Sequence, residues 1–238
     1  MRLDKYLSSG GKYTRREAGE AIRHGAVTLN GLVVKDPSRK TNAETDTVTV
    51  SGKLFRYTEF RYLKLNKPRG YVSTTDPDDR SVMNLIPSEF RKAGAFPCGR
   101  LDIDTTGLLL ITNDGQLAHE LLSPRHHCEK TYRYKCKAIG GDQVRKLEEG
   151  IDLGDFRSMP CKVDACDPEN GTITVTEGKY HQIKRMFLAV GSEILELERI
   201  RFAGLTLSGI EKEGDYSELD GSEIELLRSL SSKQTNTQ

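Results

Sequence analysis

Two carboxylates and a guanidinium occupy alternate positions in the segment 99–110. This segment reads Gly-Arg-Leu-Asp-Ile-Asp-Thr-Thr-Gly-Leu-Leu-Leu. If it is extended, Arg100, Asp102 and Asp104 share one face, because alternate side chains of a strand point the same way. Such a face could perform acid–base or nucleophilic chemistry, or it could be a plain salt-bridge cluster. Because Asp104 heads a turn-forming Asp-Thr-Thr-Gly run, we expect it to stabilise an Asx turn. Asp102 has no such local role and is the candidate catalytic carboxylate.

A second group of polar side chains lies at the start of a predicted helix over 180–190, which Gly191 ends. The apolar stripe of this helix is formed by Ile183, Met186, Phe187 and Val190. Lys184 and Arg185 therefore point away from the core. They could serve a functional site or simply be solvated, and His181 could equally be a structural histidine.

The basic residues are concentrated at the start of the chain. The whole chain has 36 Lys and Arg against 35 Asp and Glu, a net charge of +1. Residues 1–40 alone hold nine Lys and Arg but only four Asp and Glu. A basic head on a slightly acidic body indicates a polyanionic partner, although a solvated charged face has the same composition.

A short helix of about ten residues is predicted after Thr14. Thr14 and Glu17 have the spacing of a capping box, in which each side chain bonds the other residue's backbone N–H. Arg15 and Arg16 fall in the first turn, where the helix dipole favours anions rather than cations. Together with the free N–H groups they could form a phosphate site, and Arg23 lies on the same face as Arg16.

The remaining patterns predict an α+β chain with two domains. A hairpin turns at Asn30-Gly31, and a linker is expected near 52–60. Further strands are predicted at 61–66, 108–112 and 130–137 and within 194–207, a hairpin over 163–176 with its turn at Asn170-Gly171, and helices at 115–122, 142–150 and from Ser222 onward. We therefore expect a small domain over 1–58 that includes the linker. A larger domain over 59–238 would hold a mixed, mainly antiparallel sheet flanked by helices.

Composition excludes several classes of protein. The longest uninterrupted apolar run, 186–190, is far shorter than the ~20 residues of a membrane span, and residues 1–10 lack a secretory signal. We therefore expect a cytoplasmic protein. The five cysteines are odd in number and form no C-x-x-C motif, which favours reduced thiols. His126, His127 and Cys128 are adjacent and would chelate a metal poorly from a strand, so no metal is expected.

The basic head resembles a known RNA-binding module. The runs 3–7, 14–18 and 27–31 are similar to those of the S4 RNA-binding domain, over roughly residues 1–50. The resemblance implies that this domain binds structured RNA. The residues that it implies as RNA contacts are Lys5, Arg15, Arg16 and Arg23.

Four motifs in order extend the resemblance to nearly the whole chain. They lie in segments 66–70, 99–109, 129–132 and 178–186, and they resemble the RsuA/RluB/E/F family of pseudouridine synthases. Segment 123–132 is most similar to the branch of this family that acts on 16S rRNA of the small ribosomal subunit. The resemblance implies an α+β pseudouridine synthase domain behind the S4 domain. It also implies isomerisation of one uridine to pseudouridine (position 516 of 16S rRNA by resemblance).

The resemblance also implies roles for individual residues. Asp102 would be the essential carboxylate, acting as a nucleophile at C1′ or as a base at C2′. Lys184 would pair with it, Tyr132 would pack against the uracil, and Arg100 would fill the gap left by the extruded nucleotide. Further RNA contacts are expected at Lys67, Arg125, His181 and Arg185. No cofactor or metal is implied, and the partner would be 16S rRNA or a partly assembled small subunit, met by a monomer.

Three alternatives stay open from the sequence. The same chemistry could act on a uridine of 23S rRNA. The protein could instead be a non-catalytic S4-type ribosome-assembly factor, which would need no role for Asp102. Finally, Asp102 and Asp104 could form the acid–base pair of a glycosidase.

Overall fold

The computed structural model describes residues 1–123 and 126–232. These residues form two compact units. The first comprises residues 1–61, 86–96 and 112–114, and the second comprises the rest of the described chain. The long N-terminal part of the first unit ends near the predicted boundary at residue 58, but two later segments also belong to this unit. The assignment of 1–58 and 59–238 as domains stays a prediction.

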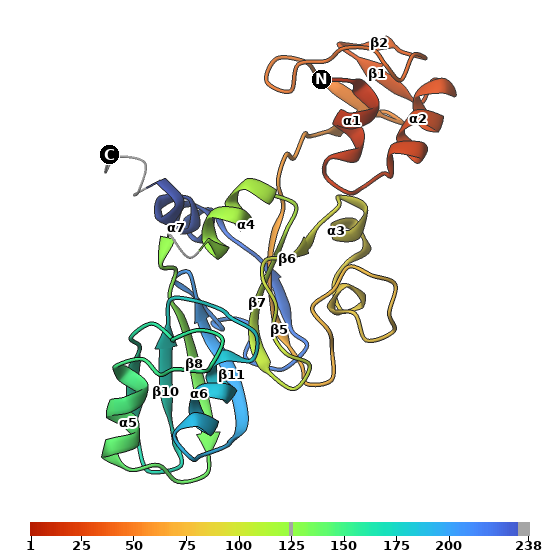
Figure 1. The fold of residues 1–238 in the computed structure, drawn as a ribbon. Coiled ribbons are helices and arrows are strands. Elements are labelled where there is room, and N and C mark those ends of the chain that lie inside the picture. Colours follow the sequence, from red (N-terminus) through yellow and green to blue (C-terminus); the bar gives the residue numbers. More distant parts are fainter. Residues whose placement is uncertain (124–125, 233–238) are drawn as a thin grey trace. The chain divides into compact units, whose positions relative to one another are not determined.

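The first unit combines short helices with a four-stranded sheet (Figure 1). Its helices are α1 (Leu3–Ser8), α2 (Arg15–Arg23) and α3 (Ser88–Lys92). The sheet has the order β2-β1-β3-β4, with β1 (Val27–Leu29), β2 (Leu32–Val33), β3 (Val48–Val50) and β4 (Lys53–Phe55). The core contains Leu3, Leu7, Ala18, Ile22 and Val27, all fully buried.

Two local predictions for this unit are confirmed. The Thr14 hydroxyl accepts a hydrogen bond from the Glu17 N–H, and the Glu17 carboxylate accepts one from the Thr14 N–H. Asn30 and Gly31, both with positive φ, turn the chain between β1 and β2. The predicted linker was wrong at its start, because Ser51 and Gly52 make a second turn with positive φ that pairs β4 with β3.

A nine-stranded sheet runs through the second unit. Its order is β13 (Tyr216–Glu218), β5 (Tyr62–Lys67), β7 (Thr106–Thr112), β11 (Ile194–Phe202), β8 (Lys130–Cys136), β10 (Asn170–Val175) and β9 (Lys162–Ala165), with β12 (Leu205–Thr206) paired to β11 and β6 (Phe96–Pro97) paired to β7. β7 and β11 are parallel, whereas β11 with β8, β8 with β10 and β10 with β9 are antiparallel. The predicted mixed, mainly antiparallel sheet is confirmed.

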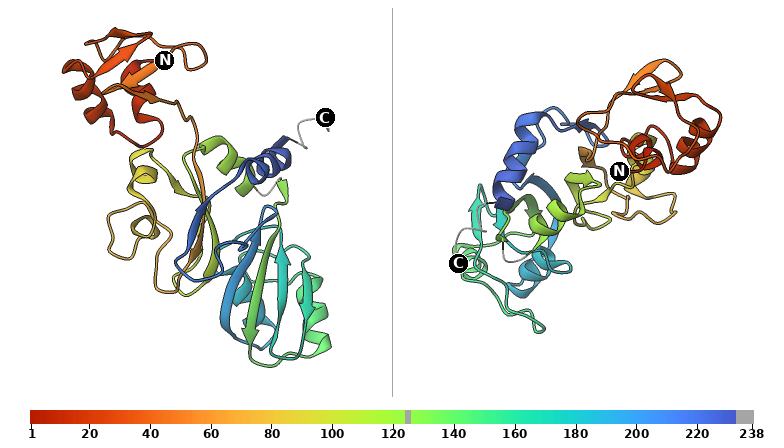
Figure 2. Two further views of the ribbon diagram at one scale, coloured as in Figure 1. Left: turned by 180° about the vertical axis from the view of Figure 1, so that it is seen from behind. Right: turned by 90° about the horizontal axis from the view of Figure 1, so that it is seen from above.

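Helices cover one face of the strands β8, β10 and β11. The second unit contains η1 (Val82–Asn84), α4 (Gly115–Leu122), α5 (Gly141–Glu148), α6 (Gln182–Ala189) and α7 (Gly221–Ser232). α5 and α6 lie on the same side of these strands (Figure 1), and Figure 2 shows the strands from behind with no helix in front of them. Alternate residues of β8 are buried under the helices, where Tyr134 packs edge-on against Phe187 of α6 at 4.9 Å between ring centroids. Within the described residues, no helix combines the length and the apolar character needed to cross a membrane.

A predicted turn and a predicted helix start in this unit lie a few residues earlier in the structure than expected. The chain reverses between β9 and β10 at residues 166–169, where the Asp167 carboxylate accepts hydrogen bonds from the N–H groups of Glu169 and Asn170. Asn170-Gly171 therefore begins β10 instead of forming the turn. The last helix is capped by Asp220 and not by Ser222: the Asp220 carboxylate accepts a hydrogen bond from the Glu223 N–H, and the Glu223 carboxylate accepts one from the Asp220 N–H.

Gly107 allows β7 and β11 to approach closely. Its φ is +98°, and a Cβ added there would lie 2.4 Å from the Arg199 carbonyl oxygen. Arg199 is itself buried and its Nε donates to the Leu108 carbonyl at 2.7 Å. This contact fixes the start of β7, and with it the end of the loop that carries Asp102.

Candidate active site

Asp102 lies in the loop that leads from β6 into β7. The segment 100–104 is not extended as predicted, because the chain turns at 102–105, where the Thr105 N–H donates to the Asp102 carbonyl at 3.1 Å. The alternation that should have aligned Arg100 with the two aspartates is therefore lost, and Arg100 is exposed at the edge of the site. Both aspartates nevertheless reach one cation.

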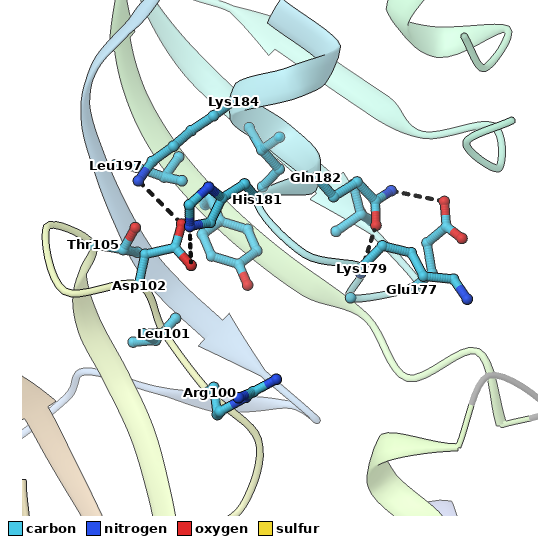
Figure 3. Close-up of a pocket in the computed structure, with 14 residues that line it drawn as sticks. Arg100, Leu101, Asp102, Thr105, Glu177, Lys179, His181, Gln182, Lys184 and Leu197 are labelled. Atoms are coloured by element: carbon cyan, nitrogen blue, oxygen red, sulfur yellow. Dashed lines mark hydrogen bonds and ion pairs between the residues drawn. The ribbon is translucent and has the colours of Figure 1, made fainter. Parts of the chain in front are cut away.

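The ammonium of Lys184 on α6 joins the two aspartates. Its Nζ lies 3.0 Å from Asp102 Oδ2 and 2.5 Å from Asp104 Oδ1, and Figure 3 shows the side chain reaching down from α6 to Asp102. The Lys184 and Asp102 side chains are only 21% and 28% exposed. Asp104 was predicted to serve an Asx turn, but the structure adds an ion pair that the local pattern did not predict.

The charges of this cluster support one another. Burial alone would lower the pKa of Lys184, but its hydrogen bonds to Asp104 and Asp102 outweigh burial and leave that pKa raised. Burial likewise acts to raise the pKa of Asp104, but the hydrogen bond and charge of Lys184 prevail and lower it. At neutral pH the cluster therefore holds a protonated lysine and an ionised Asp104.

His181 approaches Asp102 from the other side of the carboxylate. Its Nε2 lies 3.6 Å from Asp102 Oδ1 (Figure 3). The residue is the N-cap of α6 and has left-handed backbone angles, φ 48° and ψ 30°. Its imidazole ring stacks on Tyr180, with 3.8 Å between centroids and 18° between planes.

These side chains line one pocket in the second unit, which Figure 3 draws. Arg100, Asp102, Tyr132, His181 and Lys184 all contribute to its wall, so the structure brings together the predicted catalytic set and one predicted RNA contact. Tyr132 on β8 is nearly fully buried there. The cavity volume of about 80 Å³ is well below the ~300 Å³ of pockets that enclose a small ligand. It fits part of a nucleotide, with the rest left outside.

The sequence interpretation missed the residues that hold the entry to α6. The amide of Gln182 donates to Glu177 Oε1 at 2.7 Å and accepts from the Lys179 N–H at 3.0 Å. The same Glu177 oxygen accepts from the Met159 N–H at 2.8 Å. Glu177 and Gln182 are both buried. In the sequence, only their position at the two ends of the 177–182 run pointed to a structural role, and this position did not distinguish them from surface residues.

Lys67 was predicted to contact RNA, and the structure contradicts this. The side chain is fully buried beneath the loop, where its Nζ donates to the carbonyl of Thr105 at 2.8 Å and of Pro68 at 3.1 Å. Burial lowers the pKa of Lys67 to about 8, although the charges of Asp104 and Asp102 partly oppose the shift. Lys67 therefore supports the loop that carries Asp102 from inside.

Arg185, another predicted RNA contact, lies outside the pocket wall. Arg185 forms an ion pair with Asp155, donates to the Leu153 carbonyl and lies 5.2 Å from the Phe156 ring centroid. Its guanidinium thus holds the loop before β9. Arg125 lies outside the described residues.

Three of the four residues predicted to contact RNA in the first unit line a second cavity. Arg15, Arg16 and Arg23 line a hollow of about 610 Å³ together with Arg2 and the acidic Asp4 and Asp36. Arg15 and Arg16 remain mostly exposed, although Arg15 lies 3.8 Å from Asp4. Lys5 is exposed on α1 but does not line this hollow.

The geometry of the pocket favours chemistry by one carboxylate. A glycosidase pair needs one carboxyl group that stays protonated, which requires a raised pKa. Asp104 has a lowered pKa and pairs with the Lys184 ammonium, so it does not fit the acid role of such a pair. Among residues 1–123 and 126–232, no group of three or more His, Cys, Asp or Glu side chains could hold a metal ion.

Comparison with known proteins gives consistent matches. Residues 61–189 match the family described as RNA pseudouridylate synthase, and residues 1–46 match the S4 domain. The chain is 41% identical to the uncharacterised RNA pseudouridine synthase YtzG of Bacillus subtilis (strain 168), over 95% of this chain and 98% of that protein. It is 40% identical to ribosomal small subunit pseudouridine synthase A of Escherichia coli (strain K12), over 94% and 98% of the two chains. A crystal structure of a pseudouridylate synthase aligns with a TM-score of 0.66 and 38% identity, covering 95% of this chain and 99% of the other.

Proposed function

The chain belongs to the RNA pseudouridylate synthase family, and from this premise we propose that it isomerises one uridine of the small-subunit ribosomal RNA, with Asp102 as the essential carboxylate. Asp102 carries the proposal because it is accessible in a pocket, lies 3.0 Å from the Lys184 ammonium and shares the pocket wall with Tyr132. A non-catalytic RNA-binding protein needs none of these three features. The relative from Escherichia coli named for the small ribosomal subunit supports the choice of RNA.

The reaction replaces one bond to the ribose by another. The N1–C1′ bond of uridine breaks, the uracil turns, and C5 bonds to C1′. C5 then loses its proton while N1 gains one, so product and substrate are isomers. Because the reaction consumes no electrons and no water, it requires neither a redox cofactor nor a hydrolytic metal. We expect a monomer that acts in the cytoplasm on 16S rRNA or on a partly assembled small subunit.

Asp102 could start this reaction in two ways. As a nucleophile it would attack C1′ and hold the sugar while the uracil turns. As a base it would remove the C2′ proton and leave a glycal. Both routes need an ionised carboxylate, and the Lys184 ammonium stabilises that form and fixes its orientation.

The pocket also indicates how the uridine would be presented. Because Asp102 lies in the wall of a pocket of only about 80 Å³, its carboxylate could not reach the sugar of a base that stays stacked in a duplex, so we expect the nucleotide to be extruded. Tyr132 would then pack against the uracil, and the exposed Arg100 at the pocket edge could occupy the vacated place in the RNA. Extrusion costs a few kcal/mol, which stacking and phosphate contacts can offset.

The test compares Asp102→Asn with Asp104→Asn. Transcribed small-subunit rRNA carrying tritium at uridine C5 releases the label when pseudouridine forms. Asp102→Asn should abolish the release while RNA affinity in a filter-binding assay changes less than about threefold, since an isosteric neutral side chain removes only the charge. Asp104→Asn should retain measurable turnover. Wild-type rates in Asp102→Asn would refute the proposal.

The RNA target is tested separately in cells. Pseudouridines are mapped in both ribosomal RNAs from cells with and without this protein. Loss of one pseudouridine from the small-subunit RNA supports the proposed target. Loss from the large-subunit RNA instead would keep the chemistry and replace the substrate.

A further inference from the structure

Tyr180 lies between two residues that line the pocket of Asp102, Lys179 and His181, although it does not line the pocket itself. The residue is 73% exposed, which by itself is ordinary for a single surface residue. Its ring, however, is stacked on the imidazole of His181, which lines the pocket and reaches to within 3.6 Å of Asp102. The two rings therefore form a short stack beside the carboxylate, with His181 in the pocket wall and Tyr180 outside it.

The backbone around this stack is held rigidly. His181 adopts left-handed angles, which a residue with a Cβ rarely adopts and which persist only where the surroundings enforce them. The enforcing bonds join Gln182 to Glu177 and to the Lys179 N–H, and the Arg185 N–H to the His181 carbonyl. Such enforced strain is concentrated at binding and catalytic sites.

We propose that Tyr180 and His181 form a stacking platform for the nucleotide next to the target uridine. The inference rests on the proposed function, because the target uracil must lie beside Asp102, in the pocket whose wall includes His181. The outer face of Tyr180 is one ring further away and is exposed, so it is placed for the neighbouring base. Stacking accepts any of the four bases, which suits a contact that anchors the RNA without reading its sequence.

Lys179 would supply charge for the phosphate of the same nucleotide. It precedes Tyr180 directly, is exposed and contributes to the pocket wall. Within residues 1–123 and 126–232, no carboxylate lies at ion-pair distance from its ammonium. Its described side-chain contact is with Phe156, whose ring centroid lies 5.9 Å from Nζ. A ring stack beside a cation that no carboxylate neutralises is the combination that binds single-stranded nucleotides.

A fluorescence experiment tests the platform directly. The chain contains no tryptophan, so Tyr180→Trp introduces a single reporter that keeps an aromatic face at this position. Tyr216→Trp is the control, since Tyr216 is also exposed, at 46%, but lies on β13, where neither of its sequence neighbours lines the pocket. Addition of a small-subunit rRNA fragment that contains the mapped uridine should strongly quench the Tyr180→Trp emission and leave the Tyr216→Trp emission nearly unchanged.

Abasic substrates then identify the base that stacks. Tyr180→Leu should raise KM by roughly 5- to 100-fold and leave kcat within about twofold. Removing the base on one side of the target should raise the wild-type KM by a similar factor, with no further rise in Tyr180→Leu, because the same contact is already lost. It should also abolish the quenching of Tyr180→Trp.

Each contrary result overturns a defined statement. Unquenched Tyr180→Trp emission, with the RNA shown to be bound by filter binding, refutes the platform and leaves the proposed function intact. Quenching that survives removal of either neighbouring base refutes the assignment to a neighbour. Failure of the wild-type protein to release tritium from the RNA refutes the proposed function itself, and the platform with it.

Discussion

Replacing Lys184 by Met tests the electrostatic support of Asp102, the proposed catalytic carboxylate. The substitution removes the charge but keeps an unbranched stem. At the observed 3.0 Å from Asp102, two unit charges interact by about 5.5 kcal/mol at an effective dielectric constant of 20, and by about 1.4 kcal/mol at 80. Because both side chains are about a quarter exposed, an intermediate value of about 3 kcal/mol applies.

Only the part of this interaction that strengthens in the transition state changes kcat, so the largest expected fall in kcat is roughly 100-fold, since each 1.36 kcal/mol of barrier is a factor of ten. The assay is single-turnover tritium release at saturating RNA, which isolates the chemical step from binding. Lys184→Arg keeps the charge and should remain within about tenfold of the wild type. Lys162→Met is the matched control, since it removes an exposed lysine of β9 that lies outside the pocket.

Two results would refute this reasoning. Turnover by Lys184→Met that equals that of Lys162→Met would show that Asp102 needs no neighbouring cation. Equal losses in Lys184→Arg and Lys184→Met would show that the stem or its hydrogen-bond geometry matters and not the charge.

Three further predictions concern RNA binding and stability. The double variant Arg15→Glu, Arg16→Glu should weaken RNA binding. The slope of log Kd against log salt concentration should flatten by roughly 1.5 to 2, because each arginine is expected to contact one phosphate. An unchanged slope contradicts contact with phosphate. Lys67 has a pKa of about 8 in the folded chain and about 10.4 in the unfolded chain, so between these pH values the unfolded chain binds more protons. The free energy of unfolding should therefore rise with pH across this interval, by up to about 3 kcal/mol relative to Lys67→Met. Urea denaturation of both proteins at the two ends of the interval measures the difference, and a difference that stays constant or falls contradicts the prediction. Gly107→Ala should lower the free energy of unfolding by about 2–4 kcal/mol, because its Cβ would meet a backbone carbonyl. The control Gly214→Ala, at φ +90° in open space, should lower it by only about 1–2 kcal/mol. Equal losses of stability in denaturation would show that β7 can move aside.

Structure that depends on neighbouring residues was predictable from the sequence. The capping box of Thr14 and Glu17 spans four residues, and the Asn30-Gly31 turn needs only two residues that tolerate positive φ. Their geometry follows from local chemistry whatever the rest of the chain does. The same logic missed Ser51-Gly52, because Ser is a weaker signal for a left-handed turn than Asn.

Features that depend on packing were not predictable in this way. Lys67 looked like a surface cation because the sequence does not show that a loop folds over it. The ion pair between Lys184 and Asp104 joins residues that are 80 positions apart, which no periodicity links. The resemblance to a family, and not the pattern of residues, pointed to the pairing of Lys184 with Asp102.

The place of β11 in the sheet has a consequence for the timing of activity during synthesis. This strand lies between β7, which follows the Asp102 loop, and β8, which carries Tyr132, although it is made after both of them. A nascent chain that has not yet reached Phe202 therefore lacks the spacer that sets the distance between the two halves of the pocket. Such a chain could already hold RNA through its first unit, but it would have no competent centre, so an incomplete translation product could occupy ribosomal RNA without modifying it.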